Sequence, residues 1–153
     1  MFSFSRNRKF KLINLYPPLI GARIRVVKAD AAMTSIDVEM KLTWWNRNIV
    51  GTHFGGSLYA MCDPFFMAIL MSNLGRDYIV WDKAASIQFL KPGRSHVRAH
   101  FEIPPEKIAE IRAQADSQYK VEPQFEVDVV GDDGVVVAHV TKLLYVRRKP
   151  ASQ

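Results

Sequence analysis

An acidic side chain interrupts the longest apolar stretch of the chain. Asp63 lies between Phe54 and Leu70, where most other residues are apolar. Burying a carboxylate costs several kcal/mol unless a partner or a raised pKa relieves the charge. Because lone buried carboxylates concentrate at functional sites, we interpret Asp63 as a candidate catalytic base or nucleophile. A structural carboxylate bound by a nearby backbone N–H is one alternative, and a position at a helix kink caused by Pro64 is another.

Two adjacent glycines, Gly55 and Gly56, stand at the start of the same stretch. Glycines at the beginning of a helix leave backbone N–H groups uncovered, and these groups can donate to an anionic oxygen. Gly55 is therefore a candidate oxyanion donor and Gly56 a candidate substrate contact. Close packing of a helix against a sheet is the alternative explanation for the pair.

The spacing of Gly55 and Asp63 predicts an oligomer. Eight residues correspond to about 12 Å along a helix at ~1.5 Å per residue, whereas a reacting carbonyl must lie ~3 Å from both catalytic groups. One helix does not satisfy both distances. We therefore expect a homodimer or homotetramer in which Asp63 of one subunit meets Gly55 of another, so that the site lies at the subunit interface.

A helix and a long sheet are the elements that must position these residues. Nearly every residue of 56–74 is apolar, which predicts one helix covered on all sides. Strict alternation predicts half-buried strands at residues 34–41, 97–103 and 125–129. The order of elements predicts an α+β fold, in which a long antiparallel β-sheet wraps around a central apolar α-helix inserted after the second strand.

The remaining segments complete this arrangement. Residues 78–90 are rich in strand-forming side chains, residues 104–118 have helical spacing, and residues 131–134 predict the turn of a hairpin into a last strand over 135–146. Residues 6–16 predict a short amphipathic helix that ends at Pro17-Pro18 and docks through Phe10, Ile13 and Leu15. We expect a single domain over 1–153, with residues 1–20 as an N-terminal helical extension.

The pattern of Asn48, six residues, Gly55-Gly56, six residues and Asp63 resembles the signature of hot-dog thioesterases of the phenylacetate-pathway type. Residues 87–93 resemble the strand of that family that ends in an aromatic residue, Leu, a basic residue, Pro and Gly. The chain is also similar to a less characterised bacterial branch of these proteins. The resemblance implies the hot-dog fold and hydrolysis of an acyl-CoA thioester to CoA and a carboxylic acid, without a cofactor.

The resemblance also implies roles for catalytic residues. Asp63 corresponds to the base or nucleophile, Gly55 to the donor that binds the thioester oxygen, and Asn48 to a residue that positions water or substrate. The family has His directly before the two glycines, whereas this chain has Phe54 there and His53 one position earlier. His53 is therefore a candidate catalytic residue, with a helix-capping loop histidine as the alternative.

Substrate contacts follow from the same correspondence and from charge. Asp82 matches a polar family residue on the strand after the helix, although Asp82 and Lys83 also suit surface ion pairs. The candidate substrate-binding residues are Phe54, Gly56, Tyr59, Asp82, Lys83, Lys91 and Arg94.

The net charge of +6 is concentrated near the ends of the sequence. Residues 1–28 hold seven basic and no acidic side chains, whereas residues 29–146 hold 11 basic and 15 acidic ones. Nucleic-acid binding favours basic residues interleaved with stacking aromatics on one face, and that pattern is absent from the sequence. We therefore exclude a nucleic-acid partner and expect a solvated surface, or one that attracts the phosphates of CoA.

Other classes of protein are excluded by simple counts. Cys62 is the single cysteine, so no disulfide forms within the chain and a cytoplasmic setting is the default. His96 and His100 lie about 13 Å apart on one strand face at ~3.3 Å per residue, so no metal site is predicted. The apolar run of 54–70 is shorter than the ~20 residues of a membrane span.

Two further functions fit the sequence. A non-catalytic acyl-CoA or lipid binder would keep the pocket and lack the chemistry, and Phe54 in place of His supports it. A hot-dog dehydratase or hydratase would need a catalytic His paired with an acid across the interface, for which His53 and Asp63 are the candidates.

Overall fold

The structure, a computed structural model, describes residues 12–150. Within these residues one antiparallel sheet of six strands has the order β1-β2-β4-β5-β6-β3. Its strands are β1 (Ile24–Ala29), β2 (Ser35–Met40), β3 (Tyr78–Phe89), β4 (Val97–Glu102), β5 (Gln124–Gly131) and β6 (Val136–Arg148). The α+β class and the position of the apolar helical segment, after the second strand, are as predicted.

The central helical segment is two helices and not one. These are α3 (Gly55–Ala60) and α4 (Phe65–Leu74), separated by the non-helical residues 61–64. Proline removes a backbone donor and blocks the preceding turn, so Pro64 ends the helical hydrogen bonding here. The prediction of one continuous helix over 56–74 is therefore wrong, and the kink at Pro64 is confirmed.

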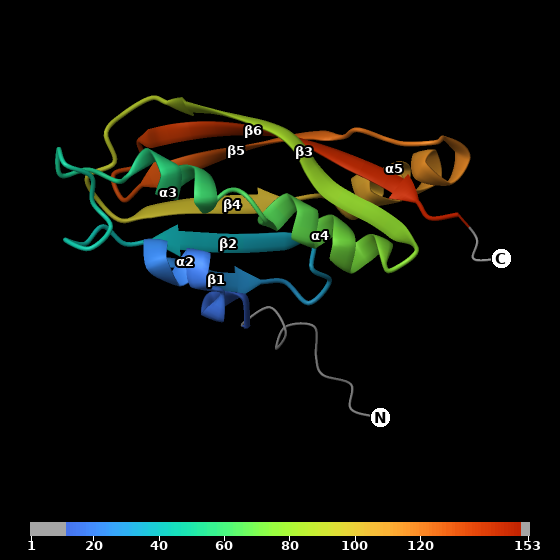
Figure 1. Cartoon of the computed structure of the whole chain (residues 1–153), viewed down its shortest axis with the longest axis horizontal. Helices are drawn as coiled ribbons and strands as arrows, with labels where there is room; N and C mark the ends of the chain where they lie inside the picture. The colour runs from blue at the N-terminus through green and yellow to red at the C-terminus, as the bar shows by residue number, and fades with distance from the viewer. Residues whose placement is uncertain (1–11, 151–153) are drawn as a thin grey trace.

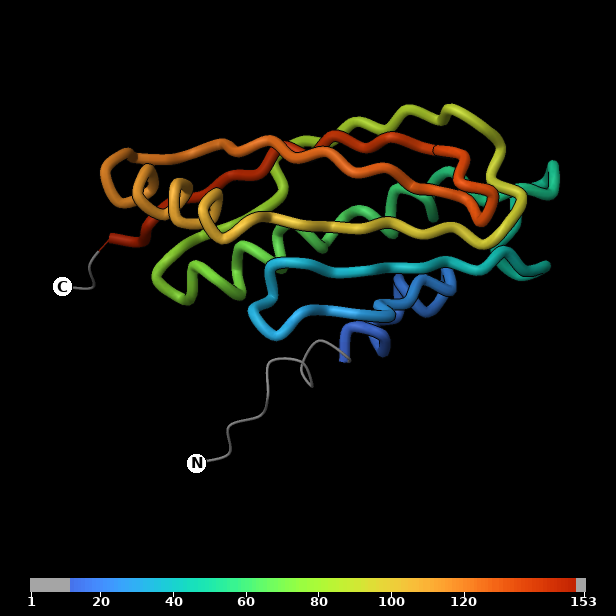
Figure 2. Tube along the Cα trace, turned by 180° about the vertical axis from the view of Figure 1, so that it is seen from behind, coloured from blue at the N-terminus to red at the C-terminus, as the bar shows by residue number. Residues whose placement is uncertain are grey.

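Both helices lie against one face of the sheet, and Figure 1 shows them running along the strands. Figure 2, from behind, has the strands in front and these helices beyond them. The inner residues of β2 and β4 are buried and the outer ones are not, as the alternation predicts. The core is centred on Phe65, Phe66 and Phe101, whose rings lie 5.0 Å (Phe65–Phe101) and 5.2 Å (Phe66–Phe101) apart.

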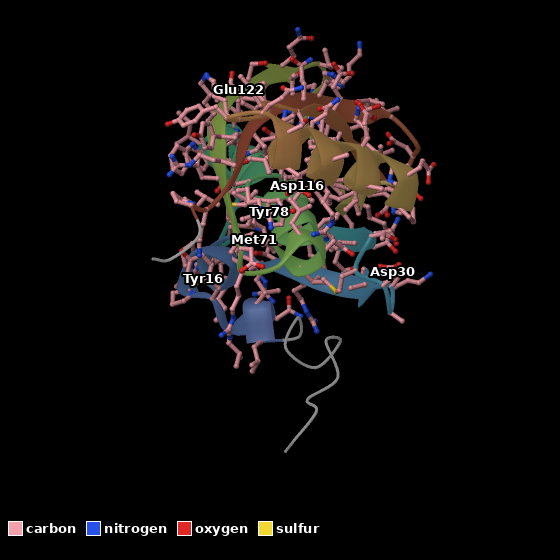
Figure 3. All side chains as sticks on the ribbon, turned by 90° about the vertical axis from the view of Figure 1, so that its right-hand side faces the viewer. Tyr16, Asp30, Met71, Tyr78, Asp116 and Glu122 are labelled. Atoms are coloured by element: carbon pink, nitrogen blue, oxygen red, sulfur yellow. The ribbon has the colours of Figure 1, made fainter. Side chains whose placement is uncertain are left out.

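The last helix, α5 (Pro105–Ser117), packs at the far end of the molecule from α3. The Tyr78 hydroxyl donates to Asp116 at 2.6 Å, and the Arg112 guanidinium lies 5.3 Å from the centre of the Tyr78 ring. Figure 3 shows Tyr78 and Asp116 side by side at this end. These contacts hold α5 against the start of β3.

The N-terminal region differs from the prediction. A 3-10 turn η1 (Leu12–Leu15) precedes α2 (Pro17–Ala22), so the two prolines begin a helix instead of ending one. Proline suits the first helical turn because its missing N–H has no partner there. Ile13 packs against the core, whereas Leu15 is exposed, and Phe10 lies outside the described residues.

Strand β3 lies at an edge of the sheet and pairs only with β6 among the described strands. A bulge at Lys83 shifts the register, so that Asp82 faces Leu144 while Ala84 faces Leu143. The extra residue changes which side chains point inward, because strand side chains alternate. Asp82 therefore shares the inner face of the sheet with Phe89.

The apolar segment Gly55–Leu74 has the length and composition of a membrane-spanning helix. It ends four residues beyond the run of 54–70 on which the prediction of no span rests. Core helices of soluble proteins satisfy the same criterion. In this structure the segment is broken at residues 61–64 and packs on the inner face of the sheet.

Candidate functional site

Asp63 lies in the break between α3 and α4. Its backbone N–H makes a long hydrogen bond of 3.4 Å to the carbonyl of Ala60, and Pro64 follows it directly. The side chain is 49% exposed. Asp63 is therefore a carboxylate at the surface of a helix break, and the expectation of a carboxylate embedded in a continuous apolar helix is corrected.

One oxygen of the Asp63 carboxylate is bound twice. Its Oδ1 accepts hydrogen bonds from Lys142 Nζ at 2.9 Å and from the Tyr59 hydroxyl at 3.0 Å. Tyr59, one turn earlier on α3, thus directs its hydroxyl to Asp63. Burial and the bond to Asp63 raise the pKa of Tyr59, so the hydroxyl keeps its proton and donates it.

Lys142 was not predicted from the sequence. It lies on β6 with its side chain 0% exposed, between the buried residues Val140 and Leu144 on the inner face. Every second residue from Ala138 to Val146 is buried, and Lys142 is the charged member of that series. A lysine at an inward-facing position of an otherwise apolar strand is the sequence signal that would have identified it.

Asp82 completes the group around Lys142, with its Oδ2 at 3.2 Å from Lys142 Nζ. Burial raises the pKa of Asp82, and Lys142 opposes that shift. Lys83 contacts Glu122 on the other side of the strand at 2.8 Å, as in the surface alternative. We call Tyr59, Asp63, Asp82 and Lys142 the Asp63 cluster.

A second group of predicted residues lines a cleft of about 370 Å³ at the start of α3. We call it the Gly55 cleft, and its lining includes Asn48, His53, Gly55, Phe89, Lys91 and Arg94. Asn48 organises the loop before α3: its Oδ1 accepts from the N–H groups of Val50 and Thr52, and its Nδ2 donates to the Thr52 hydroxyl. The Asn48 side chain thus builds one wall of the cleft.

His53 is buried at the base of this loop. Its Nε2 lies 2.8 Å from the carbonyl of Ser95, and its Nδ1 is buried without a hydrogen-bond partner among the described residues. Burial lowers the pKa of His53, while the bond to Ser95 opposes that shift. The ring is therefore neutral at pH 7, and with Nε2 donating to Ser95, Nδ1 is left as an acceptor.

The backbone N–H groups of Gly55 and Gly56 have no acceptor within the described chain. An added Cβ on Gly55 would lie 2.9 Å from the Phe89 ring, and one on Gly56 would lie 2.5 Å from the Phe54 ring. Phe54 itself is 57% exposed and contributes to a small adjacent hollow with Trp45 and Ser57. Aromatic rings therefore occupy the space beside both glycines.

Lys91 and Arg94 stand exposed at the mouth of the Gly55 cleft. Neither side chain forms an ion pair with any residue of 12–150. Arg98, by contrast, is bound to Asp132 at 2.9 Å. Two uncompensated cations at the rim of a cleft favour an anionic ligand.

The predicted site residues thus fall into two groups, each of which contacts a different part of β3. The Asp63 cluster contains Asp82, whereas the Gly55 cleft contains Phe89, which is seven positions later on β3. Strand geometry places these positions about 20 Å apart at ~3.3 Å per residue. Asp63 and Gly55 have no direct contact within one chain among the bonds of the described residues.

Cys62 is buried directly before Asp63. Burial raises the pKa of this thiol to about 12, with Lys142 opposing the shift. A thiol of this kind is not ionised at neutral pH and is a poor nucleophile.

Comparisons with known proteins assign the chain to a family. Residues 6–146 match the family described as "Domain of unknown function (DUF4442)". Comparison with the curated proteins finds no match.

Solved structures share the fold at low sequence identity. A Pseudomonas aeruginosa protein described as a "Probable Thioesterase" has a TM-score of 0.81 at 18% identity, over 91% of this chain and 93% of that one. A Haemophilus influenzae thioesterase has a TM-score of 0.67 at 12% identity, over 97% and 92%. The Escherichia coli PaaI protein from the phenylacetic acid degradation operon has a TM-score of 0.64 at 18% identity, over 97% of each chain. The chain therefore has the hot-dog fold and belongs to the family described as "Domain of unknown function (DUF4442)".

Proposed function

We propose that this protein is a thioesterase that hydrolyses an acyl-CoA thioester to CoA and a carboxylic acid. The observation that carries the proposal is Asp63, a half-exposed carboxylate at a helix break whose Oδ1 is held by Lys142 and Tyr59. Proteins of the same fold are described as a "Probable Thioesterase", a "putative thioesterase" and a thioesterase, which supports this class of reaction. No cofactor enters the proposed reaction, and a cytoplasmic location belongs to the same proposal.

In the proposed reaction, Asp63 Oδ2 takes a proton from a water molecule as the water oxygen attacks the thioester carbonyl. The carbonyl electron pair moves to oxygen, and the Gly55 N–H stabilises that negative charge. When the intermediate collapses, the C–S bond breaks and the CoA thiolate receives the proton from Asp63. Because the Asp63 carboxylate is half-exposed and its Oδ2 has no donor among the described residues, general-base catalysis through water fits better than direct attack.

The proposed site draws on a second copy of the chain, because Asp82 of the Asp63 cluster and Phe89 beside Gly55 lie about 20 Å apart along β3 at ~3.3 Å per residue. Strand β3 provides the surface: it is an edge strand with unpaired backbone groups, and its inner-face residue Phe89 is 58% exposed. Twofold symmetric pairing is the commonest mode of association. We therefore propose a dimer formed by antiparallel pairing of β3 with β3 of the second copy.

The bulge at Lys83 gives this pairing a register. If the twofold axis passes through Ser86, then Ala85 lies opposite Ile87 of the second copy and Ala84 lies opposite its Gln88. The bulge then brings Asp82 opposite Phe89 of the second copy, with both on the inner face. This places the Asp63 cluster of each copy beside the Gly55 cleft of the other.

The proposed substrate position follows from the charges. The phosphates of CoA would lie at the mouth of the Gly55 cleft near Lys91 and Arg94, which have no other anion among the described residues. The acyl group would extend toward the dimer interface. Asn48 and His53 would act by shaping the cleft, since the Asn48 side chain is bonded within its own loop and His53 Nε2 is bonded to Ser95.

A non-catalytic acyl-CoA binder is the second candidate, because the Gly55 cleft and its cations exist independently of Asp63. It would bind CoA esters without releasing thiol. For a dehydratase, His53 would have to act on substrate, whereas its Nε2 is bonded to Ser95.

Thiol release from a panel of short, long and aromatic acyl-CoAs tests the proposal. Cys62 is buried, so it contributes little background to a thiol reagent. We expect the wild type to hydrolyse at least one class, and Asp63→Asn to lower kcat about 10²- to 10⁴-fold. Binding of acyl-CoA by the wild type without hydrolysis of any member would contradict the enzyme and support the binder.

A further inference from the structure

Lys142 is a buried cation that no step of the proposed reaction uses. Its side chain is 0% exposed, in the middle of the strand that joins β5 to β3. Lysine is rarely buried in full unless it is paired. Removing its charge from water is costly, so the groups that compensate it indicate what it does.

Three oxygens from separate elements surround Lys142 Nζ. They are Asp63 Oδ1 at 2.9 Å, Asp82 Oδ2 at 3.2 Å and the Tyr59 hydroxyl at 3.4 Å. Burial alone would lower the pKa of Lys142, but the bonds to Asp63 and Asp82 outweigh it and raise that pKa. The ammonium group is therefore charged at neutral pH and joins the helix break to the edge strand.

These contacts decide how the Asp63 carboxylate is presented. The backbone provides little constraint, because Asp63 lies outside both helices and its N–H bond is 3.4 Å long. Oδ1 has two donors, whereas Oδ2 has none within the described residues. Rotation of the carboxylate would break both bonds, so Oδ2 is left as the oxygen free to accept a proton.

We propose that Lys142 is a positioning residue, which fixes Asp63 so that Oδ2 receives the proton from the attacking water. Asp82 anchors Lys142 from the opposite side, and Tyr59 shares the binding of Oδ1. Lys142 itself exchanges no proton with substrate, because three protein oxygens surround its buried Nζ. This role rests on the proposed function of Asp63 as a base.

The test removes Lys142 together with the charge it would leave unpaired, in the double variant Lys142→Met/Asp82→Asn. We expect kcat to fall about 30- to 100-fold with KM within about 2-fold of wild type, since misplacement of a catalytic group acts on the chemical step. Lys142→Arg, which keeps the cation, should recover part of kcat.

Lys107→Met is the matched control, because Lys107 forms an ion pair with Glu110 on α5, far from the site. It should leave kcat and KM unchanged. Thermal unfolding and light scattering identify variants that are folded and assembled as the wild type. If the double variant does not fold, Tyr59→Phe removes the second donor to Oδ1, and it should lower kcat about 3- to 10-fold at constant KM.

A second readout does not depend on activity. A crystal structure of the double variant should show the Asp63 carboxylate in a different orientation from the wild type, because Oδ1 has lost its Lys142 donor. An inactive wild type with this difference would refute the thioesterase and leave the Lys142–Asp63 coupling supported. A folded double variant with wild-type kcat and an unchanged carboxylate orientation would overturn the positioning role. For Tyr59→Phe, unchanged kcat and an unchanged orientation would do the same.

Discussion

The Phe89 ring covers the position that a side chain on Gly55 would occupy, with its Cζ 2.9 Å from an ideal Cβ. Phe89 is the last residue of β3 and Gly55 the first of α3, so the contact joins the end of the edge strand to the beginning of the helix. Because the ring is 58% exposed, it can move by a few tenths of an ångström. The Phe89 ring is therefore in close contact with Gly55, the proposed oxyanion donor.

Substitutions at Gly55 should separate this packing from the role of its N–H group. Gly55→Ala adds a Cβ and keeps the N–H, whereas Gly55→Pro also removes the N–H at a first helical position where proline is tolerated. We expect Gly55→Pro to lower kcat about 10²- to 10³-fold relative to Gly55→Ala, as for loss of one oxyanion donor. Steady-state kinetics on an acyl-CoA measures this ratio.

Gly21→Ala serves as the control for glycine replacement, because nothing lies within 4 Å of its added Cβ. Equal kcat values in Gly55→Pro and Gly55→Ala would show that the N–H does not bind the oxyanion.

A cysteine at the proposed twofold axis should cross-link the dimer. In the Ser86 register the two copies of Ser86→Cys face each other about 4.5–5.5 Å apart at Cα, within the range of a disulfide. Gln88→Cys would place its two copies about 13 Å apart at ~3.3 Å per residue, which is too far. Non-reducing electrophoresis after mild oxidation should show a covalent dimer for the first variant alone. Cross-linking of Gln88→Cys instead, or a monomer by light scattering, would refute the register.

Removing the free cations of the Gly55 cleft should weaken binding of CoA specifically. We expect Lys91→Met/Arg94→Met to raise KM for an acyl-CoA about 3- to 10-fold at low salt, with less effect at high salt. An acyl thioester of N-acetylcysteamine, which lacks phosphates, should keep its wild-type KM. Arg98→Met is the control, since Arg98 is already paired with Asp132. A parallel rise for both substrates would indicate damage to the cleft instead of lost phosphate contacts.

The buried ring of His53 should make the protein less stable in mild acid. Burial lowers the pKa of His53 in the folded state, so below its ordinary value of 6.5 the unfolded chain binds the proton more readily. The free energy of unfolding should therefore fall as pH decreases from 6.5 toward the lower folded pKa. Urea unfolding at a series of pH values measures this slope, which His53→Gln should flatten. An equally steep slope in the variant would assign it to other groups.

The sequence predicts the sheet well, because alternation is a local property. The inward series of β2, β4 and β5 is confirmed by burial, and so is the turn at residues 131–134. The two-helix break was harder to predict from apolar composition, since hydrophobicity does not distinguish one helix from two. Pro64 was the local signal for that break.

The partners of Asp63 depend on contacts that local patterns do not contain. Lys142 lies 79 residues away in sequence and reaches Asp63 only because β6 passes beneath the helix break. Local sequence patterns do not predict the bulge at Lys83 either, although it decides whether Asp82 faces Lys142 or solvent. Asp63 itself was identified because an acid in an apolar run stands out by composition alone.

The bulge makes the conformation of one residue part of the proposed site. Deleting Lys83 would remove the bulge and leave Asp82 opposite Leu144 and Ala84 opposite Leu143 as neighbouring pairs, so Asp82 would stay on the inner face. Straightening the bulge with Lys83 retained would instead turn Asp82 and Val80 outward in exchange for Trp81. The backbone at Lys83 therefore acts as a selector of chemistry, adding or withdrawing a carboxylate without mutating it.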